Sequence, residues 1–273
     1  MLVVSELKHL NEGECADIYE LDDHTVLKLG KAGWGRDMLY QEYRNGKQIG
    51  DSDIAAPKVY DFVEIEGRFG YTMDRLKDVT VLDLMWKYPW NVLAYAKKLA
   101  AIHARIHSVK APEELPMLVD KYREFLDTKK SIPEDQKRRL FQELEQLGTE
   151  GECCICHGDF HPINILADNN KCFVIDWVLA TRGCAEADVA GTYLITSTYS
   201  SHTKEKNPFK SIISSIGGKL IAKAYLSEYI SITKTNKQKI KQWIPIRAAT
   251  YVDVGLSETL NESFLKIVNK HYK

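Results

Sequence analysis

The sequence predicts an α+β fold in which a small β-rich lobe is followed by a larger helical lobe. In residues 1 to about 75, short runs rich in β-forming residues are separated by turn residues, as in β-hairpins. After about residue 90, apolar residues recur every three or four positions, which is typical of one face of a helix. The pattern changes near residues 74–78, so we expect two domains, residues 1–75 and 76–273. A crevice between two such lobes is a usual place for a small-molecule site.

Composition and charge indicate an ordinary globular protein. Hydrophobic residues make up 44% of the 273 residues, and charged residues make up 27%. A net charge of −1 provides no bulk attraction for nucleic acid or for an anionic membrane. The apolar runs are too short for a membrane span, and the N-terminal run is too short for a signal peptide. The six cysteines form no evenly spaced framework, which favours reduced thiols and a soluble, cytoplasmic protein.

The N-terminal lobe contains two predicted hairpins with a helix between them. The runs ADIYEL and TVLKLG flank the turn residues DDH, and the runs KVYDFVEI and RFGYTM flank Glu66-Gly67. Between the hairpins, RDMLYQEYRNGKQI carries Leu39, Glu42, Tyr43 and Ile49 at helix-like spacing. We therefore expect the helix to separate the two hairpins along the chain.

The C-terminal lobe shows two clear helical patterns. Residues 92–107, VLAYAKKLAAIHARIH, repeat apolar residues in one stripe. Ser131-Ile-Pro-Glu134 has the form of a capping box with the proline just inside the helix start. Phe141, Leu144 and Leu147 follow at helical spacing. We expect one helix over residues 92–107 and another that begins just after Ser131.

One predicted β-hairpin interrupts the helical lobe, within CHGDFHPINILADNNKCFVIDW at residues 156–177. The segment NILADNNKCFVID has the form of two strands around Asn169-Asn170, and asparagine tolerates the positive φ of such a turn. A two-residue loop would place Asn164 opposite Ile175, and a three-residue loop would place it opposite Asp176. Either register brings Asn164 and Asp176 close together at the open end of the hairpin.

This arrangement suits phosphoryl transfer. An amide oxygen and a carboxylate that converge can share a hard cation such as Mg²⁺, and Asp159, on the loop that enters the hairpin, can reach the same point. The metal would neutralise phosphate charge while a nearby carboxylate takes up a hydroxyl proton. The spacing His157-x-Asp159-x-x-x-x-Asn164 is that of a kinase catalytic loop. Asp176, twelve residues later, falls where the second metal ligand is expected.

The motif HGDFHPINIL…VIDW resembles the signature of the aminoglycoside phosphotransferase family, relatives of choline kinase with a two-lobed, protein-kinase-like fold. The similarity extends over most of the chain. TVLKLG resembles the lysine-bearing strand, YTMDRL the interlobe hinge, LAAIHARIH the following helix and AEADVAGTYLI the segment after the metal aspartate. The resemblance implies an ATP- and Mg²⁺-dependent kinase that phosphorylates a hydroxyl group of a small molecule.

The resemblance also implies roles for residues of the catalytic loop and its surroundings. Asp159 would be the catalytic base, and Asn164 and Asp176 would bind Mg²⁺. Asp188 would brace the catalytic loop. Each of these residues also has a simpler interpretation, because aspartate and asparagine favour turns and helix caps.

For the nucleotide, the resemblance implies four further residues. Lys28 would hold the ATP phosphates with Glu42 as its ion-pair partner, and backbone groups near Met73 and Arg75 would contact the adenine. Taken alone, Lys28 is an ordinary strand lysine and Glu42 an exposed helix glutamate. Their order along the chain favours the functional interpretation once the downstream motif is accepted.

Two metal hypotheses fail on spacing, and two histidines have an ordinary explanation. Cys153-x-x-Cys156 precedes His157 and His161 without the spacer of a zinc module, so CCIC is better explained as a buried strand. The DNNKC segment lacks the pattern of a calcium loop. His103 and His107, one helical turn apart, are expected to be packed or solvated rather than ligands.

The acceptor is the least specified part of the prediction. Residues 182–273 contain 14 lysines and arginines against 7 aspartates and glutamates, whereas a polycationic aminoglycoside requires an acidic pocket. We therefore favour a neutral or anionic metabolite. The acidic residues available to a cationic substrate are Asp253, Glu258 and Glu262. The alternatives are an aminoglycoside O-phosphotransferase that confers antibiotic resistance and a catalytically silent nucleotide-binding scaffold. A protein kinase is disfavoured because IDW replaces Asp-Phe-Gly.

Overall fold

The structure, a computed structural model, describes residues 3–13, 15–77, 79–149, 153–168, 171–198 and 208–272, with the backbone alone described for residues 208–216. The chain divides into two compact units. The first comprises Met1–Leu84 and Pro162–Ala180, and the second comprises Met85–His161 and Thr181–Lys273. Residues 76–84 and 162–180 therefore belong to the same compact unit as the β-rich part. The predicted domain boundary between residues 75 and 76 concerns the functional lobes and stays a prediction.

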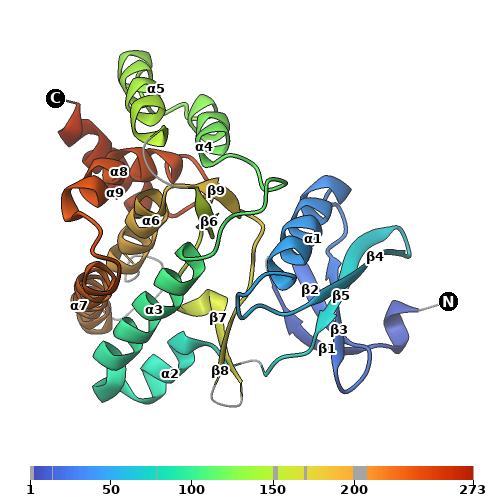
Figure 1. Cartoon of the computed structure of the whole chain (residues 1–273). Helices are drawn as coiled ribbons and strands as arrows, with labels where there is room; N and C mark the ends of the chain where they lie inside the picture. Colours follow the sequence, from blue (N-terminus) through green and yellow to red (C-terminus); the bar gives the residue numbers. More distant parts are fainter. Residues whose placement is uncertain are drawn as a thin grey trace. The chain divides into compact units, whose positions relative to one another are not determined.

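A five-stranded antiparallel sheet forms the first unit (Figure 1). After a short 3₁₀ turn, Val4–Glu6, its strands are β1 (Lys8–Glu12), β2 (Ala16–Glu20), β3 (Thr25–Gly30), β4 (Val59–Ile65) and β5 (Arg68–Asp74), in the order β1-β2-β3-β5-β4. Both predicted hairpins, β2–β3 and β4–β5, are confirmed. Tyr19, Leu27, Leu29 and Ile65 form a buried cluster on the sheet, since alternate residues of a strand share a face.

Helix α1 (Arg36–Gly50) lies against β4 and β5 and confirms the helix predicted between the hairpins. Its buried residues recur every three or four positions, so one face of the helix covers the sheet. They are Leu39, Glu42, Asn45, Gly46 and Ile49. Glu42 and Asn45 are polar, which is unusual on the buried face of a helix and indicates that these two residues have a specific role.

A further hairpin, distant in sequence from the sheet, completes the first unit. It consists of a 3₁₀ turn, Pro162–Asn164, followed by β7 (Ile165–Asp168) and β8 (Lys171–Val174). Asp168 pairs with Lys171, so two residues connect the strands and the two-residue register is correct. The predicted turn residues Asn169-Asn170 lie outside the described residues. The backbone N–H groups of Ala167 and Val174 donate to the carbonyl oxygens of Val79 and Ala55, both at 2.8 Å, which explains why the hairpin groups with this unit.

The second unit is mainly helical (Figure 1). Helix α2 (Val81–Lys87) contains the boundary between the units, and Pro89–Asn91 forms a 3₁₀ turn. The remaining described elements of the second unit are α3 (Val92–His107), α4 (Leu118–Asp127), α5 (Glu134–Gly148), β6 (Cys154–Cys156), β9 (Thr181–Gly183), α6 (Ala185–Thr198), α7 (Pro208–Thr233), α8 (Lys237–Thr250) and α9 (Glu258–His271). Helix α6 packs against both α7 and α8 and is buried on most sides. In the described part of the chain, no helix combines the length and the apolar character needed to cross a bilayer.

The helix predicted over residues 92–107 is confirmed with these bounds, but the capping box at Ser131 is wrong. Helix α5 begins at Glu134 with Pro133 as its N-cap and without a side-chain cap. The Ser131 hydroxyl and N–H instead donate to the Asp253 carboxylate, at 2.6 and 2.8 Å. A carboxylate that accepts both groups forms stronger hydrogen bonds than a neutral cap, so the tertiary contact replaces the local one.

Candidate functional site

In the first unit, an ion pair with Glu42 holds the Lys28 side chain. Strand β3 pairs with β5, so Lys28 lies opposite Tyr71, and its Nζ atom is 6.0 Å from the centre of the Tyr71 ring. Glu42 projects from the buried face of α1, and its carboxylate accepts a hydrogen bond from Lys28 Nζ. The strand lysine and the helix glutamate that the sequence pairs are therefore in direct contact.

The surroundings of Lys28 keep its amine charged. Burial alone would lower the pKa of Lys28, because a low-dielectric environment disfavours the charged form. The negative charges of Glu42 and Asp176 act in the opposite direction, and the pKa of Lys28 is raised above its usual value. Burial also raises the pKa of Tyr71, so its hydroxyl stays protonated. Lys28 is thus a positive charge fixed at neutral pH, as a phosphate-binding group must be.

Asp176 follows the β7–β8 hairpin in a left-handed backbone conformation, with φ of 67°. Such a conformation is uncommon for a residue with a side chain and persists where the surroundings hold it. Asn45 on α1 supplies part of that support, because its Nδ2 donates to the carbonyl oxygens of Trp177 at 2.9 Å and Val178 at 3.3 Å. On the other side of Asp176, the N–H of Ile175 donates to the Asn164 carbonyl oxygen at 3.0 Å.

A cavity of about 660 Å³ lies within the first unit. This volume is in the usual range for small-ligand pockets. Of the predicted site residues, Lys28, Glu42, Met73, Arg75 and Asp176 line the cavity. Tyr71 and Trp177 also line it. The cavity therefore combines an ion-paired lysine, a carboxylate and apolar surface from the sheet, which are the elements that a nucleotide site needs.

The strand end at Met73 and Arg75 forms one edge of this cavity. The Arg75 N–H already donates to the His24 carbonyl oxygen at 2.7 Å, and the Arg75 guanidinium is paired with Glu20 at 2.9 Å. A base bound at this edge would have to use other backbone groups than the Arg75 amide. This engaged amide could not be predicted from the sequence.

In the second unit, Asp159 lies on the loop that follows β6. Its side chain is 32% exposed, and its carboxylate lies 3.3 Å from His161 Nε2. Burial raises the pKa of Asp159, but the hydrogen bond from His161 and the positive groups nearby outweigh this effect and lower it. An ionised carboxylate that is partly accessible is suited to accept a proton from a bound hydroxyl.

Asp188 on α6 braces this loop. One carboxylate oxygen accepts the N–H of His157 at 2.6 Å, and the other accepts the N–H of Gly158 at 2.9 Å. The Nε2 atoms of His103 and His107, both on α3, lie 3.0 and 3.3 Å from the same carboxylate. Asp188 therefore braces the loop as the family resemblance implies, and the helix-cap interpretation is unnecessary.

The two histidines on α3 contact Asp188 directly. Burial and the neighbouring His107 lower the pKa of His103 to about 3, so its imidazole is neutral. Tyr225 lies 2.6 Å from His103 Nδ1, which leaves the Nε2–H to donate to Asp188. Burial would raise the pKa of Asp188, yet His103 and His107 hold it well below its usual value. The expectation that these histidines are packed is therefore correct, but their partner was not predicted.

The structure thus places the predicted residues in two groups. Lys28, Glu42, Met73, Arg75 and Asp176 line one cavity of the first unit, and Asn164 lies opposite the residue next to Asp176. Asp159 belongs to the second unit, which is described by itself. Sequence analysis missed Asn45, although a buried asparagine one turn after Glu42 on an apolar face was a usable signal.

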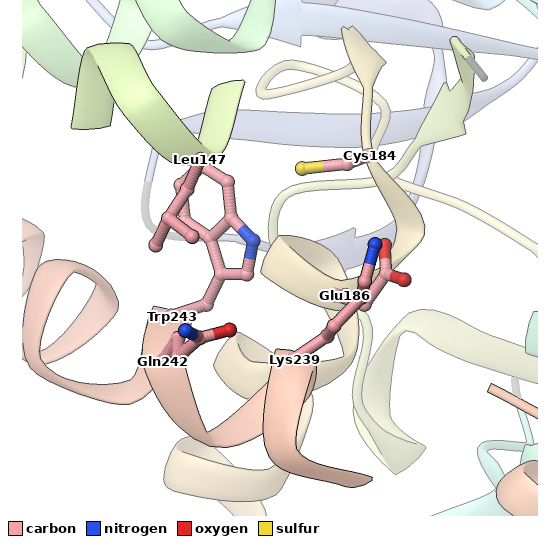
Figure 2. A pocket seen from close by; sticks show the side chains of 6 residues that line it. All are labelled: Leu147, Cys184, Glu186, Lys239, Gln242 and Trp243. Carbon is pink, nitrogen blue, oxygen red and sulfur yellow. The ribbon is translucent and has the colours of Figure 1, made fainter. Parts of the chain in front are cut away.

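Two other features of the second unit are unsuited to the acceptor. Figure 2 shows a small pocket between α5, α6 and α8, lined by Leu147, Cys184, Glu186, Lys239, Gln242 and Trp243. Its volume of about 10 Å³ is at most enough for one water molecule. Asp253, one of the acidic residues predicted for a cationic substrate, already accepts two hydrogen bonds from Ser131, which precedes α5. Neither feature therefore offers a site for a sugar-sized cation.

Comparison with known proteins identifies the family of this chain. The model of the phosphotransferase enzyme family matches residues 6–206, well over half of the chain. A search of curated proteins gives no match. The structure is also similar to several solved structures, each less than 25% identical in sequence.

Three of these structures illustrate the likeness. An aminoglycoside-3'-phosphotransferase of type VIII is 16% identical with a TM-score of 0.60, over 90% of this chain and 94% of that chain. APH(2")-IIa, in a ternary complex with streptomycin and ATP, is 17% identical with a TM-score of 0.56, over 97% and 91%. A putative fructosamine-3-kinase from Haemophilus somnus 129PT is 15% identical with a TM-score of 0.61, over 97% and 90%. The fold is therefore protein-kinase-like, and the chain belongs to the phosphotransferase enzyme family.

Proposed function

We propose that the protein is an ATP- and Mg²⁺-dependent phosphotransferase that phosphorylates a hydroxyl group of a small molecule. The observation that supports this most directly is the cavity of the first unit, where the Lys28–Glu42 ion pair and Asp176 line the same space. A positive charge and a metal-binding carboxylate in one cavity suit a nucleotide triphosphate.

In this proposal, Lys28 binds the phosphates of ATP and Glu42 keeps its amine in position. The amine is already held by its ion pair with Glu42 and is only partly exposed, so it loses little freedom when phosphate binds. The adenine lies along the edge formed by Met73 and Arg75, where carbonyl groups rather than the Arg75 N–H would contact it.

Asn164 and Asp176 are the residues that would hold Mg²⁺. Their donor set, an amide oxygen and a carboxylate, fits a hard cation that keeps several of its waters. The fixed turn around Asp176, supported by Asn45 and by the Asn164–Ile175 hydrogen bond, restricts where the carboxylate points. When bound, the metal would neutralise charge on the phosphates during transfer.

Asp159 acts as the catalytic base. Its ionised carboxylate accepts the proton of the substrate hydroxyl as the oxygen attacks the terminal phosphorus of ATP, and ADP leaves with the electrons of the broken bond. Asp188 fixes the backbone that carries Asp159, so the base does not need to be ordered at each turnover.

The acceptor is a hydroxylated metabolite of neutral or negative charge. The excess of basic residues in 182–273 and the engagement of Asp253 with Ser131 both disfavour a polycation. The similar solved structures include an enzyme bound to streptomycin and a putative fructosamine-3-kinase, so sugars and their derivatives come first among candidates.

The test is an ATP-consumption screen against a panel of hydroxylated metabolites with aminoglycosides included. We expect one class of acceptor to stimulate Mg²⁺-dependent ADP formation. Asp159→Ala should abolish it while ATP still raises the melting temperature, and Asp176→Ala should also remove the response to Mg²⁺. A melting temperature that MgATP does not change would contradict the proposal and favour a silent scaffold. Strong stimulation by aminoglycosides would instead support the resistance enzyme.

A further inference from the structure

Arg247 on α8 is a buried arginine that contacts the loop carrying Asp159. Its side chain is only 2% exposed, and Nη2 donates to the Gly158 carbonyl oxygen at 2.8 Å. Nη2 also donates to the Tyr251 hydroxyl, and the guanidinium lies over the rings of Tyr122 and Tyr251, 4.9 and 4.7 Å from their centres. All of these groups belong to the second unit.

A buried guanidinium without a directly bonded carboxylate is costly, because the charge loses its hydration. In the described part of the chain, the hydrogen bonds of Arg247 go to a carbonyl oxygen and to the hydroxyls of Tyr251 and Thr250, and none goes to a carboxylate. The aromatic rings recover part of this cost through cation–π attraction. A buried charge that costs this much free energy is expected to serve a function. Within the described residues, its long-range hydrogen bond goes to Gly158, so we look for that function at the loop.

The Gly158 peptide is held from both sides. Its N–H donates to Asp188 at 2.9 Å, and its carbonyl oxygen accepts from Arg247 at 2.8 Å. Its φ of 84° lies in the region that favours glycine, so the backbone here bends in a way that needs external support. Asp159 is the next residue, so the two contacts together set the direction in which its side chain leaves the loop.

The neighbouring helix leaves room for this arginine. At Gly191 on α6, an added Cβ atom would lie 2.4 Å from Arg247 Nη2 and 2.6 Å from Nε. Any side chain at this position would displace the guanidinium. Glycine is unfavourable inside a helix, so its presence here is consistent with a need for that space.

We propose that Arg247 is a positioning residue for phosphoryl transfer, which holds the Gly158 peptide so that Asp159 is directed at the acceptor hydroxyl. The inference rests on the proposed function for its catalytic consequence but not for its structural one. The positive charge of Arg247 has a second effect. Burial raises the pKa of Asp159 and His161 lowers it, and Arg247 adds to the groups that lower this pKa.

The first test compares Arg247→Met with Arg139→Met. Arg139 on α5 also donates to a backbone carbonyl, but it is exposed, and that carbonyl belongs to Tyr272 at the end of α9 and not to the loop. With MgATP as the only substrate and water as acceptor, Arg247→Met should reduce kcat about 100-fold with little change in KM, because a small displacement of the base is that costly. Equal kcat values in the two variants, both folded by circular dichroism, would overturn the proposal.

The second test displaces Arg247 without removing its charge. Gly191→Ala should lower kcat in the same way, although alanine favours helix more than glycine does. The matched control is Gly217→Ala on α7, where an added Cβ meets no atom of the described residues within 4 Å. A Gly191→Ala enzyme as active as the Gly217→Ala enzyme would show that the position of Arg247 does not matter.

A third measurement separates this inference from the proposed function. Amide hydrogen exchange at His157 and Gly158 should be faster in Arg247→Met than in Arg139→Met, because the peptide loses one of its two supports. If the wild type formed no ADP, the proposed function would fail. The exchange rates of the two variants would still test whether Arg247 holds the Gly158 peptide. Unchanged exchange would then overturn that role as well.

Discussion

The side-chain amide of Asn45 donates a hydrogen bond to the carbonyl oxygen of Trp177 at 2.9 Å. Asn45 lies one helical turn after Glu42 on α1, and Trp177 follows Asp176. The helix that holds the partner of Lys28 therefore also holds the backbone next to the proposed metal ligand. Both halves of the proposed nucleotide site in the first unit depend on the same buried face of α1.

This relationship predicts the effect of Asn45→Asp. The new carboxylate would face two carbonyl oxygens and would remove the Asn45 donor from both, so the variant should lose about 1–3 kcal/mol of unfolding free energy. The rise in melting temperature on adding MgATP should also shrink, because Asp176 is held less well. Arg44→Ala, on the exposed face of the same helix, serves as control. Identical denaturant midpoints and MgATP responses in the two variants would contradict the account.

The Lys28–Glu42 pair predicts a coupled effect. Lys28→Met would leave a buried carboxylate without its partner and should cost about 2–4 kcal/mol of stability, whereas Lys28→Met/Glu42→Gln should recover most of it. Activity should behave differently. Both variants should lose about 10²–10³-fold in kcat, because neither has a charge for the phosphates. A double variant that regains activity together with stability would show that Lys28 acts only as a structural residue.

The cluster around Asp188 predicts a pH dependence. The pKa of His103 is about 3 in the folded protein and about 6.5 when unfolded, so the unfolded chain binds a proton that the folded chain does not. Stability should therefore fall as the pH falls from about 6.5 towards 3, by up to about 1.4 kcal/mol per pH unit from this group. The raised pKa of His107 has the opposite sign, since its contribution is present at low pH and is lost as pH rises.

The contribution of His103 can be isolated with His103→Gln. In urea titrations between pH 6.5 and 5, this variant should show a flatter dependence of unfolding free energy on pH than the wild type. His271→Gln, at the exposed end of α9, should retain the wild-type slope. Parallel slopes for the wild type and His103→Gln would mean that the buried imidazole does not titrate as its surroundings imply.

Much of the fold could be predicted from local sequence pattern. Apolar alternation around turn residues identified the hairpins β2–β3 and β4–β5, and apolar periodicity identified α1 and α3. The hairpin register that brings Asn164 beside Ile175 was also open to prediction, whereas the metal-binding role of Asn164 and Asp176 stays a prediction. The failure at Ser131 has a clear reason, because its partner Asp253 lies 122 residues away.

The supporting residues could not be predicted for the same reason. Asn45 bonds to a residue 132 positions later, and Arg247 bonds to one 89 positions earlier. A polar residue on an apolar helix face marks Asn45 as unusual, but the sequence does not identify the partner of either residue, since each contact exists only after its own helix has packed. His103 was assigned to packing correctly, but its role as a donor to Asp188 depends on α3 and α6 being neighbours of β6.

The account depends most on Asp159 as the proton acceptor in a transfer from MgATP. The direct measurement is single-turnover transfer of labelled phosphate from ATP to the acceptor found by the screen, in wild type and Asp159→Asn. We predict a loss of 10²–10⁴-fold, roughly the usual contribution of a general base, with an unchanged MgATP effect on melting temperature. Transfer by Asp159→Asn at the wild-type rate would contradict the account.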